Sequence, residues 1–107
     1  MSTVFVEALG LYSIMTGKLH LYVDEMEVEN VLLWRDEIQE ELDSGLVPTN
    51  EQLRLLKDAD DRLLGQRERL VRDFPRAFRG ADKISRRMWW WHLREGPDVR
   101  EKAKDAA

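Results

Sequence analysis

The side chains that most often carry out catalysis are scarce in this chain. Its only histidines are His20 and His92, and it contains no cysteine. His92 and Glu95 have the i, i+3 spacing that places two side chains on one side of a helix. A histidine near the end of a helix is favoured by the helix dipole, which explains this pair without catalysis. There is also no Gly-rich phosphate loop, Gly-x-Ser-x-Gly turn or His-Glu-x-x-His motif. We therefore expect a protein that is not an enzyme and that has no catalytic residue, cofactor or small-molecule substrate.

Carboxylates are abundant, and they are the residue type that binds hard metal ions. They form two runs, which are Asp24, Glu25, Glu27, Glu29 and Asp36, Glu37, Glu40, Glu41. A calcium loop of the EF-hand type requires a glycine that the first run lacks. A di-iron bundle requires Glu-x-x-His units, and the sequence has none. We interpret both runs as solvated helix faces and predict no metal site.

The most informative segment contains three consecutive tryptophans, Trp89 to Trp91, in a basic setting. Successive helical residues are about 100° apart, so these three sweep roughly 200° and cannot all face one core. Projected at about 100° per residue, the last helix (81–94) and the residues just before it would have one face with Ala77, Ala81, Ile84, Met88 and Trp91. The opposite face would hold Trp89, Trp90, Leu93, Arg86 and Arg79. Aromatic residues and arginine are enriched at interface hot spots, so this second face is our candidate interface. The alternative is that the tryptophans complete the core of the chain itself.

The charge distribution supports association. Residues 1–61 hold 4 basic and 14 acidic residues, a net charge of −10, whereas residues 62–107 hold 13 basic and 7 acidic residues, a net charge of +6. Such halves either lie against each other or meet different partners. The leading hypothesis is therefore a small protein–protein interaction module that self-associates, with a homodimer as the simplest assembly, and another protein as the alternative partner.

Nucleic-acid binding is the alternative function. The segment 62–94 holds 10 basic and 3 acidic residues with aromatic residues between them, a composition that suits phosphate contact and base stacking. The candidate contact residues are Arg72, Arg76, Arg79, Arg86 and Arg87. The isoelectric point of about 5.2 and the acidic first half argue against this function.

Hydrophobic periodicity predicts an all-α fold, a small helical bundle. Its centre is an antiparallel hairpin of two amphipathic helices, at about 24–44 and 49–74, joined by a short Pro-containing turn. Asp24 with Glu27, and Thr49 with Gln52, have the spacing of helix-capping boxes. An apolar helix over 3–15 precedes the hairpin, and a Trp-rich helix over 81–94 follows it.

The length of 107 residues indicates one domain, which we place at 1–96. Residues 97–107 are polar and are predicted to form a flexible tail. For residues 16–24 the pattern leaves an extended connector or a helical turn open. Charges interrupt the apolar N-terminal segment, so we expect no membrane span, and the absence of cysteine favours a cytoplasmic protein.

Overall fold

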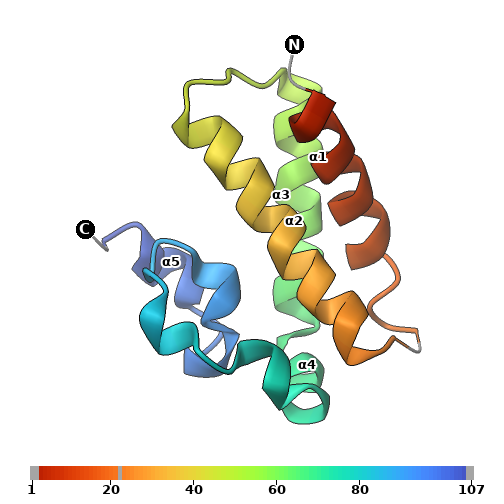
Figure 1. Ribbon diagram of the computed structural model, residues 1–107, viewed down its shortest axis with the longest axis vertical. Helices are drawn as coiled ribbons and strands as arrows, with labels where there is room; N and C mark the ends of the chain where they lie inside the picture. The colour runs from red at the N-terminus through yellow and green to blue at the C-terminus, as the bar shows by residue number, and fades with distance from the viewer. Residues whose placement is uncertain (1–2, 22, 106–107) are drawn as a thin grey trace.

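The structure is a computed structural model that describes residues 3–21 and 23–105. These residues contain helices and no strand, which confirms the predicted all-α fold (Figure 1). The α-helices are α1 (Thr3–Thr16), α2 (Glu25–Asp43), α3 (Asn50–Gly65), α4 (Arg67–Asp73) and α5 (Val99–Ala103). The 3₁₀ turns are η1 (Pro75–Phe78), η2 (Ala81–Lys83), η3 (Trp89–Trp91) and η4 (Leu93–Glu95). Among the described helices, none combines the length and the apolar character needed to span a membrane.

The starts of α2 and α3 are fixed by the side chains that the spacing predicted. The Glu27 amide donates to the Asp24 carboxylate at 2.8 Å. At the start of α3 the backbone N–H of Gln52 donates to the Thr49 hydroxyl at 3.1 Å, and the backbone N–H of Thr49 donates to the side-chain oxygen of Gln52 at 2.9 Å. Each contact satisfies an amide that has no partner within its helix.

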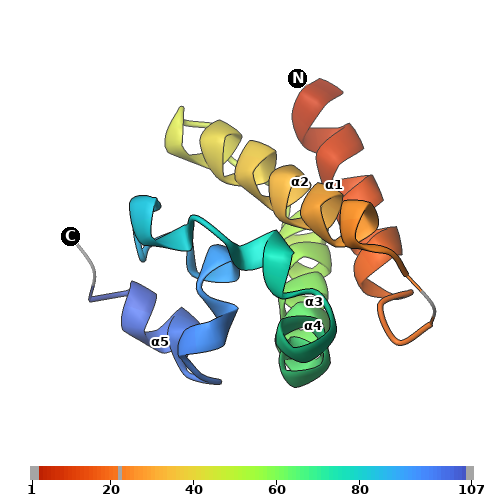
Figure 2. The same ribbon diagram turned by 60° about the horizontal axis from the view of Figure 1, so that its bottom comes forward.

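The expected hairpin is arranged differently. The helix predicted over 49–74 is divided at Gln66, where α3 ends and α4 begins. The backbones of α2 and α3 contact α1 far more than they contact each other, and α1 lies alongside both (Figures 1 and 2). The physical reason is that one face of α1, with Phe5, Ala8, Leu9 and Tyr12 buried, supplies the surface on which both amphipathic helices bury their apolar stripes.

The core extends from this three-helix unit into the C-terminal half. The fully buried side chains include Phe5 and Tyr12 of α1, Ile38 of α2 and Leu63 of α3. The segment from η1 onward folds back along α2, on the side away from α1 (Figure 1). It contributes Phe78, Trp90 and Leu93 to the same core.

The helix predicted over 81–94 is absent. The chain forms η2, η3 and η4 there, separated by residues that belong to no helix. The predicted flexible tail also contains α5, whose Val99 is buried. The connector 17–21 forms turns, and of the predicted connector residues only Tyr22 lies outside the described residues.

Candidate interaction surfaces

The predicted Trp/Arg face is not exposed in a single copy of the chain. Trp89 is 5% exposed, and Trp90 and Leu93 are fully buried. Only the two arginines of the predicted set, Arg79 and Arg86, lie at the surface. The chain itself therefore covers the tryptophans, which was the alternative interpretation. The tryptophans are buried because the chain changes direction between the 3₁₀ turns η3 and η4. A regular helix would instead leave one side of the tryptophan run in solvent.

Polar contacts fix the tryptophans in place. The indole N–H groups of Trp90 and Trp91 both donate to Oδ1 of Asp36 on α2, each at 2.7 Å. The guanidinium of Arg35 lies 4.4 Å from the centre of the Trp90 ring, within the range of a cation–π contact. The rings of Trp89 and Trp90 meet edge to face, with centres 5.7 Å apart. These contacts indicate a structural role for the run.

The five arginines proposed for nucleic-acid contact divide into two groups. Arg72 pairs with Asp73 at 2.9 Å, Arg86 with Glu95 at 3.1 Å and Arg87 with Asp43 at 3.5 Å. Arg76 and Arg79 have no ion-pair or hydrogen-bond partner for their side chains among residues 3–21 and 23–105. A continuous basic stripe is therefore interrupted by carboxylates.

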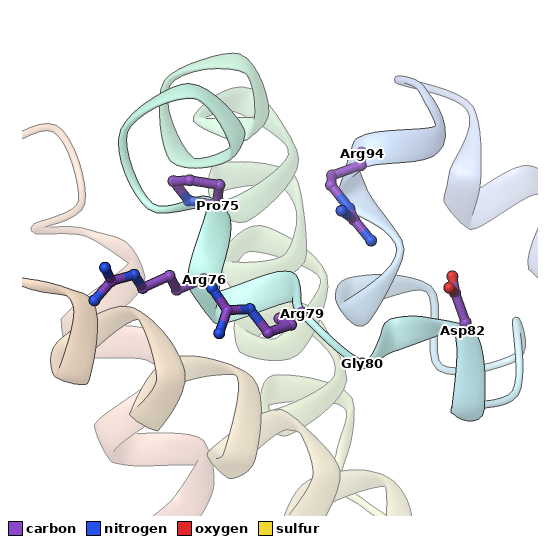
Figure 3. A pocket seen from close by; sticks show the side chains of 6 residues that line it. All are labelled: Pro75, Arg76, Arg79, Gly80, Asp82 and Arg94. Atoms are coloured by element: carbon purple, nitrogen blue, oxygen red, sulfur yellow. The ribbon is translucent and has the colours of Figure 1, made fainter.

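The two unpaired arginines border a cleft of about 450 Å³. Its lining residues are Pro75, Arg76, Arg79, Gly80, Asp82 and Arg94. Arg76 of η1 and Arg79, which directly follows η1, lie on one side, while Arg94 comes from η4 and Asp82 from η2 on the other (Figure 3). Sequence reasoning did not select Arg94 for this site, because the expected straight helix gave no reason for residue 94 to return to the chain near residue 76.

A second unpartnered surface is the outer face of α1. It carries the apolar residues Val4, Val6, Leu11 and Ile14, and all four are exposed. The buried face of the same helix carries Phe5, Ala8, Leu9 and Tyr12. The sequence contains a signal for this surface, because two apolar sets share α1 and only one of them can face the core.

The carboxylates and His92 are the side chains whose chemistry suits metal binding or catalysis. No group of three or more histidine and carboxylate side chains is placed to hold a metal ion in the part of the chain that the structure describes. His92 is buried, with Nε2 2.8 Å from the Ile84 carbonyl oxygen and Nδ1 2.9 Å from Oε2 of Glu95. Both ring nitrogens thus hold the turns 84–95 together, as the i, i+3 spacing suggested for Glu95.

No known protein family, curated protein or solved structure matches this chain. The function therefore has to be inferred from the surfaces described above.

Proposed function

We propose that this chain is a non-enzymatic helical interaction module that self-associates through the outer face of α1, where two copies pack antiparallel. The observation that carries the proposal is the spacing of the exposed residues on this face and in the turn that follows it. Six of these exposed residues follow one another at regular intervals: Val4, Glu7, Leu11 and Ile14 on α1, and Lys18 and Leu21 in the turn. The alternating intervals of three and four residues are those of a helix–helix seam.

The apolar members of the seam are unusually exposed for their type. Val4, Leu11, Ile14 and Leu21 are between 43% and 57% exposed. A helix that is apolar all round is normally buried all round, and a second copy would cover the half that α2 and α3 leave open. Gly10 has no heavy atom within 4 Å of the place a Cβ would occupy. The packing within this chain therefore does not explain a glycine in the middle of α1.

The two charges of the seam indicate the orientation. Glu7 is the only Asp or Glu, and Lys18 the only Lys or Arg, between residues 3 and 20. Both are exposed, and neither has an ion-pair partner within the described part of the chain. In a parallel pair, like charges would face each other. An antiparallel pair centred between residues 12 and 13 places each Glu7 opposite the partner's Lys18, and Leu11 opposite the partner's Ile14.

The expected affinity is modest. Helix α1 has 14 residues, which corresponds to about 21 Å of helix. A seam of this length buries an area near the lower end of specific interfaces, about 1,000 Å² in total. We therefore expect a dimer with a dissociation constant in the micromolar range, about −8 kcal/mol at 1 μM.

Sedimentation equilibrium over a concentration series tests the proposal, and exchange of the two charges tests the orientation. Glu7→Lys alone and Lys18→Glu alone each place like charges opposite each other twice in the dimer, so each should weaken association about tenfold. The double variant Glu7→Lys with Lys18→Glu restores opposite charges and should recover the wild-type dissociation constant.

Two further variants separate the seam from other causes. Glu29→Lys makes the same charge change at an exposed position of α2, and it should leave association unchanged. Ile14→Gln removes an apolar contact from the seam without touching the core, so it should favour the monomer while unfolding normally. A wild-type protein that is monomeric at about 100 μM contradicts the proposal, and so does a dimer that is indifferent to Ile14→Gln.

A further inference from the structure

The cleft between η1 and η4 is a basic site on an acidic protein. The chain has 21 acidic and 17 basic residues, yet the side chains of Arg76, Arg79 and Arg94 meet no carboxylate at ion-pair distance within residues 3–21 and 23–105. Neighbouring Arg72, in contrast, is paired with Asp73. Three unpaired guanidinium groups repel one another, and this arrangement becomes favourable when an anion is present.

The backbone beneath the cleft is held by buried side chains. Ala77 and Phe78 lie between Arg76 and Arg79, Ala81 precedes Asp82, and Leu93 precedes Arg94; all four are at most 4% exposed. Gly80, with φ of 88°, makes the bend between η1 and η2, in a region of φ that other residues rarely adopt. The arginines therefore extend from fixed positions, while their exposed side chains are free to adjust to a ligand.

We propose that this cleft binds the phosphate group of a phosphate monoester, with Arg79 and Arg94 as the principal contacts. A carboxylate has two oxygens and is satisfied by one guanidinium fork, whereas a phosphate monoester offers three terminal oxygens to forks from different sides. Its charge at neutral pH, about −1.5 to −2, matches the net charge of three arginines and Asp82. In Figure 3 the guanidinium groups of Arg76 and Arg79 both extend away from that of Arg94, so rotation of these exposed side chains would be needed to bring the three groups to one anion.

Asp82 makes the site selective. Its side chain faces the opening from the side opposite η1 (Figure 3), and it has no ion-pair or hydrogen-bond partner in the described part of the chain. A carboxylate here disfavours small bare anions, and it accepts hydrogen bonds from hydroxyl groups of the molecule that carries the phosphate. The cleft volume of about 450 Å³ lies in the range of small-molecule sites.

Titration with adenosine monophosphate, followed through the backbone amide signals of the protein, tests the site. We expect shifts at Arg79, Gly80, Asp82 and Arg94, and we expect none with adenosine, which lacks the phosphate. Arg79→Gln and Arg94→Gln should each weaken binding about tenfold. Binding should also weaken between pH 7.5 and pH 5.5, because the second pKa of the phosphate is about 6 and the dianion is lost.

Matched variants show whether adenosine monophosphate binds in the cleft or is only attracted electrostatically to the protein surface. Arg72→Gln makes the same charge change outside the cleft and should alter the affinity less than about twofold, whereas Asp82→Asn should strengthen binding of inorganic phosphate. Equal weakening by Arg72→Gln, or equal binding of adenosine and its monophosphate, overturns the proposal.

Binding of a short RNA shows whether the phosphate monoester belongs to a nucleic-acid end or to a free small molecule. A short single-stranded RNA with a 5′-phosphate that binds more tightly than adenosine monophosphate places the monoester at a nucleic-acid end. Equal affinities of the two ligands identify a free phosphorylated molecule. If the same RNA without its 5′-phosphate binds as well as with it, phosphodiesters suffice, and the monoester site is contradicted.

Discussion

Tyr12, Arg35 and Asp60 meet inside the bundle and join its three long helices. The Tyr12 hydroxyl donates to Oδ1 of Asp60 at 2.6 Å, and Arg35 donates through Nε to the same oxygen at 3.0 Å and through Nη2 to Oδ2 at 3.3 Å. All three residues are buried. A buried charge is tolerated only when paired and hydrogen-bonded, so this cluster explains how an arginine and an aspartate are accommodated in the core.

Replacement of Tyr12 by Phe keeps the ring and removes the hydrogen bond to Asp60. We expect the free energy of unfolding at pH 7 to fall by about 1–2 kcal/mol, because Asp60 loses a buried donor. Burial, and secondarily the negative charge of Asp60, raise the pKa of Tyr12 well above 10. The stability linked to this group is therefore fully present below pH 10 and is lost as the pH rises further.

Urea denaturation at a series of pH values tests both parts of this prediction. The wild-type protein should lose stability above pH 10 more steeply than Tyr12→Phe, so the difference between the two should shrink there. A constant difference across the alkaline range would show that the Tyr12 hydroxyl does not titrate with unfolding.

Asp36 offers a second test at the scale of one residue. Asp36→Ala removes the acceptor for the indole N–H groups of Trp90 and Trp91, so we expect the free energy of unfolding to fall by about 2–3 kcal/mol. Tryptophan fluorescence during urea denaturation measures the loss. Glu37→Ala, at the exposed neighbouring position, is the matched control and should change stability by less than about 0.5 kcal/mol. Equal effects of the two substitutions would contradict the anchoring role of Asp36.

At the scale of the elements, sequence reasoning succeeded where local chemistry decides the structure. The caps at Asp24 and Thr49 mark helix starts because a side chain satisfies nearby amides. The prediction of a helix over 81–94 was wrong because the helical periodicity of this segment competes with the burial of Trp89 and Trp90. Contacts of the tryptophans with α2 favour the 3₁₀ turns over a regular helix. Hydrophobic periodicity contains no information about such tertiary contacts. The same limit applies to the arginine cleft, since the return of residue 94 toward residue 76 depends on those turns.

The cap of α3 provides a test of an element. Thr49→Ala removes the acceptor for the Gln52 amide and should lower the free energy of unfolding by about 1 kcal/mol. Thr49→Ser retains the hydroxyl and should be nearly neutral. Thermal unfolding followed by circular dichroism measures both, and equal losses for Ala and Ser would contradict the capping role.

At the scale of the whole molecule, the acidic and basic halves lie against each other. Arg87 pairs with Asp43 across the halves, and Arg100 with Asp61. Other basic-half arginines donate to backbone carbonyls instead: Arg62 to that of Ser13, and Arg69 to those of Leu19 and Leu21. Two ion pairs therefore join the halves, and the other arginines named here hold chain segments in place through backbone carbonyls.

Contacts of the C-terminal segment 97–107 with α3 and Trp89 help to join the two halves, and deletion of the segment measures their contribution to stability. Val99 of α5 is buried, and Arg100 donates to Asp61 of α3 at 2.8 Å while lying 5.9 Å from the centre of the Trp89 ring. Deletion of residues 97–107 exposes Trp89 and removes these contacts, so we expect the free energy of unfolding to fall by about 2–3 kcal/mol.

A shorter deletion separates these contacts from the length of the chain. Removal of residues 104–107 leaves Val99 and Arg100 in place, and it should change stability by less than about 0.5 kcal/mol, since the ion pair of Lys104 with Glu101 is exposed. Val99→Ala, which keeps the whole segment, should cost about 1–2 kcal/mol. Urea denaturation of the three variants decides between a packed helix and a flexible tail, because a tail predicts that all three unfold like the wild-type protein.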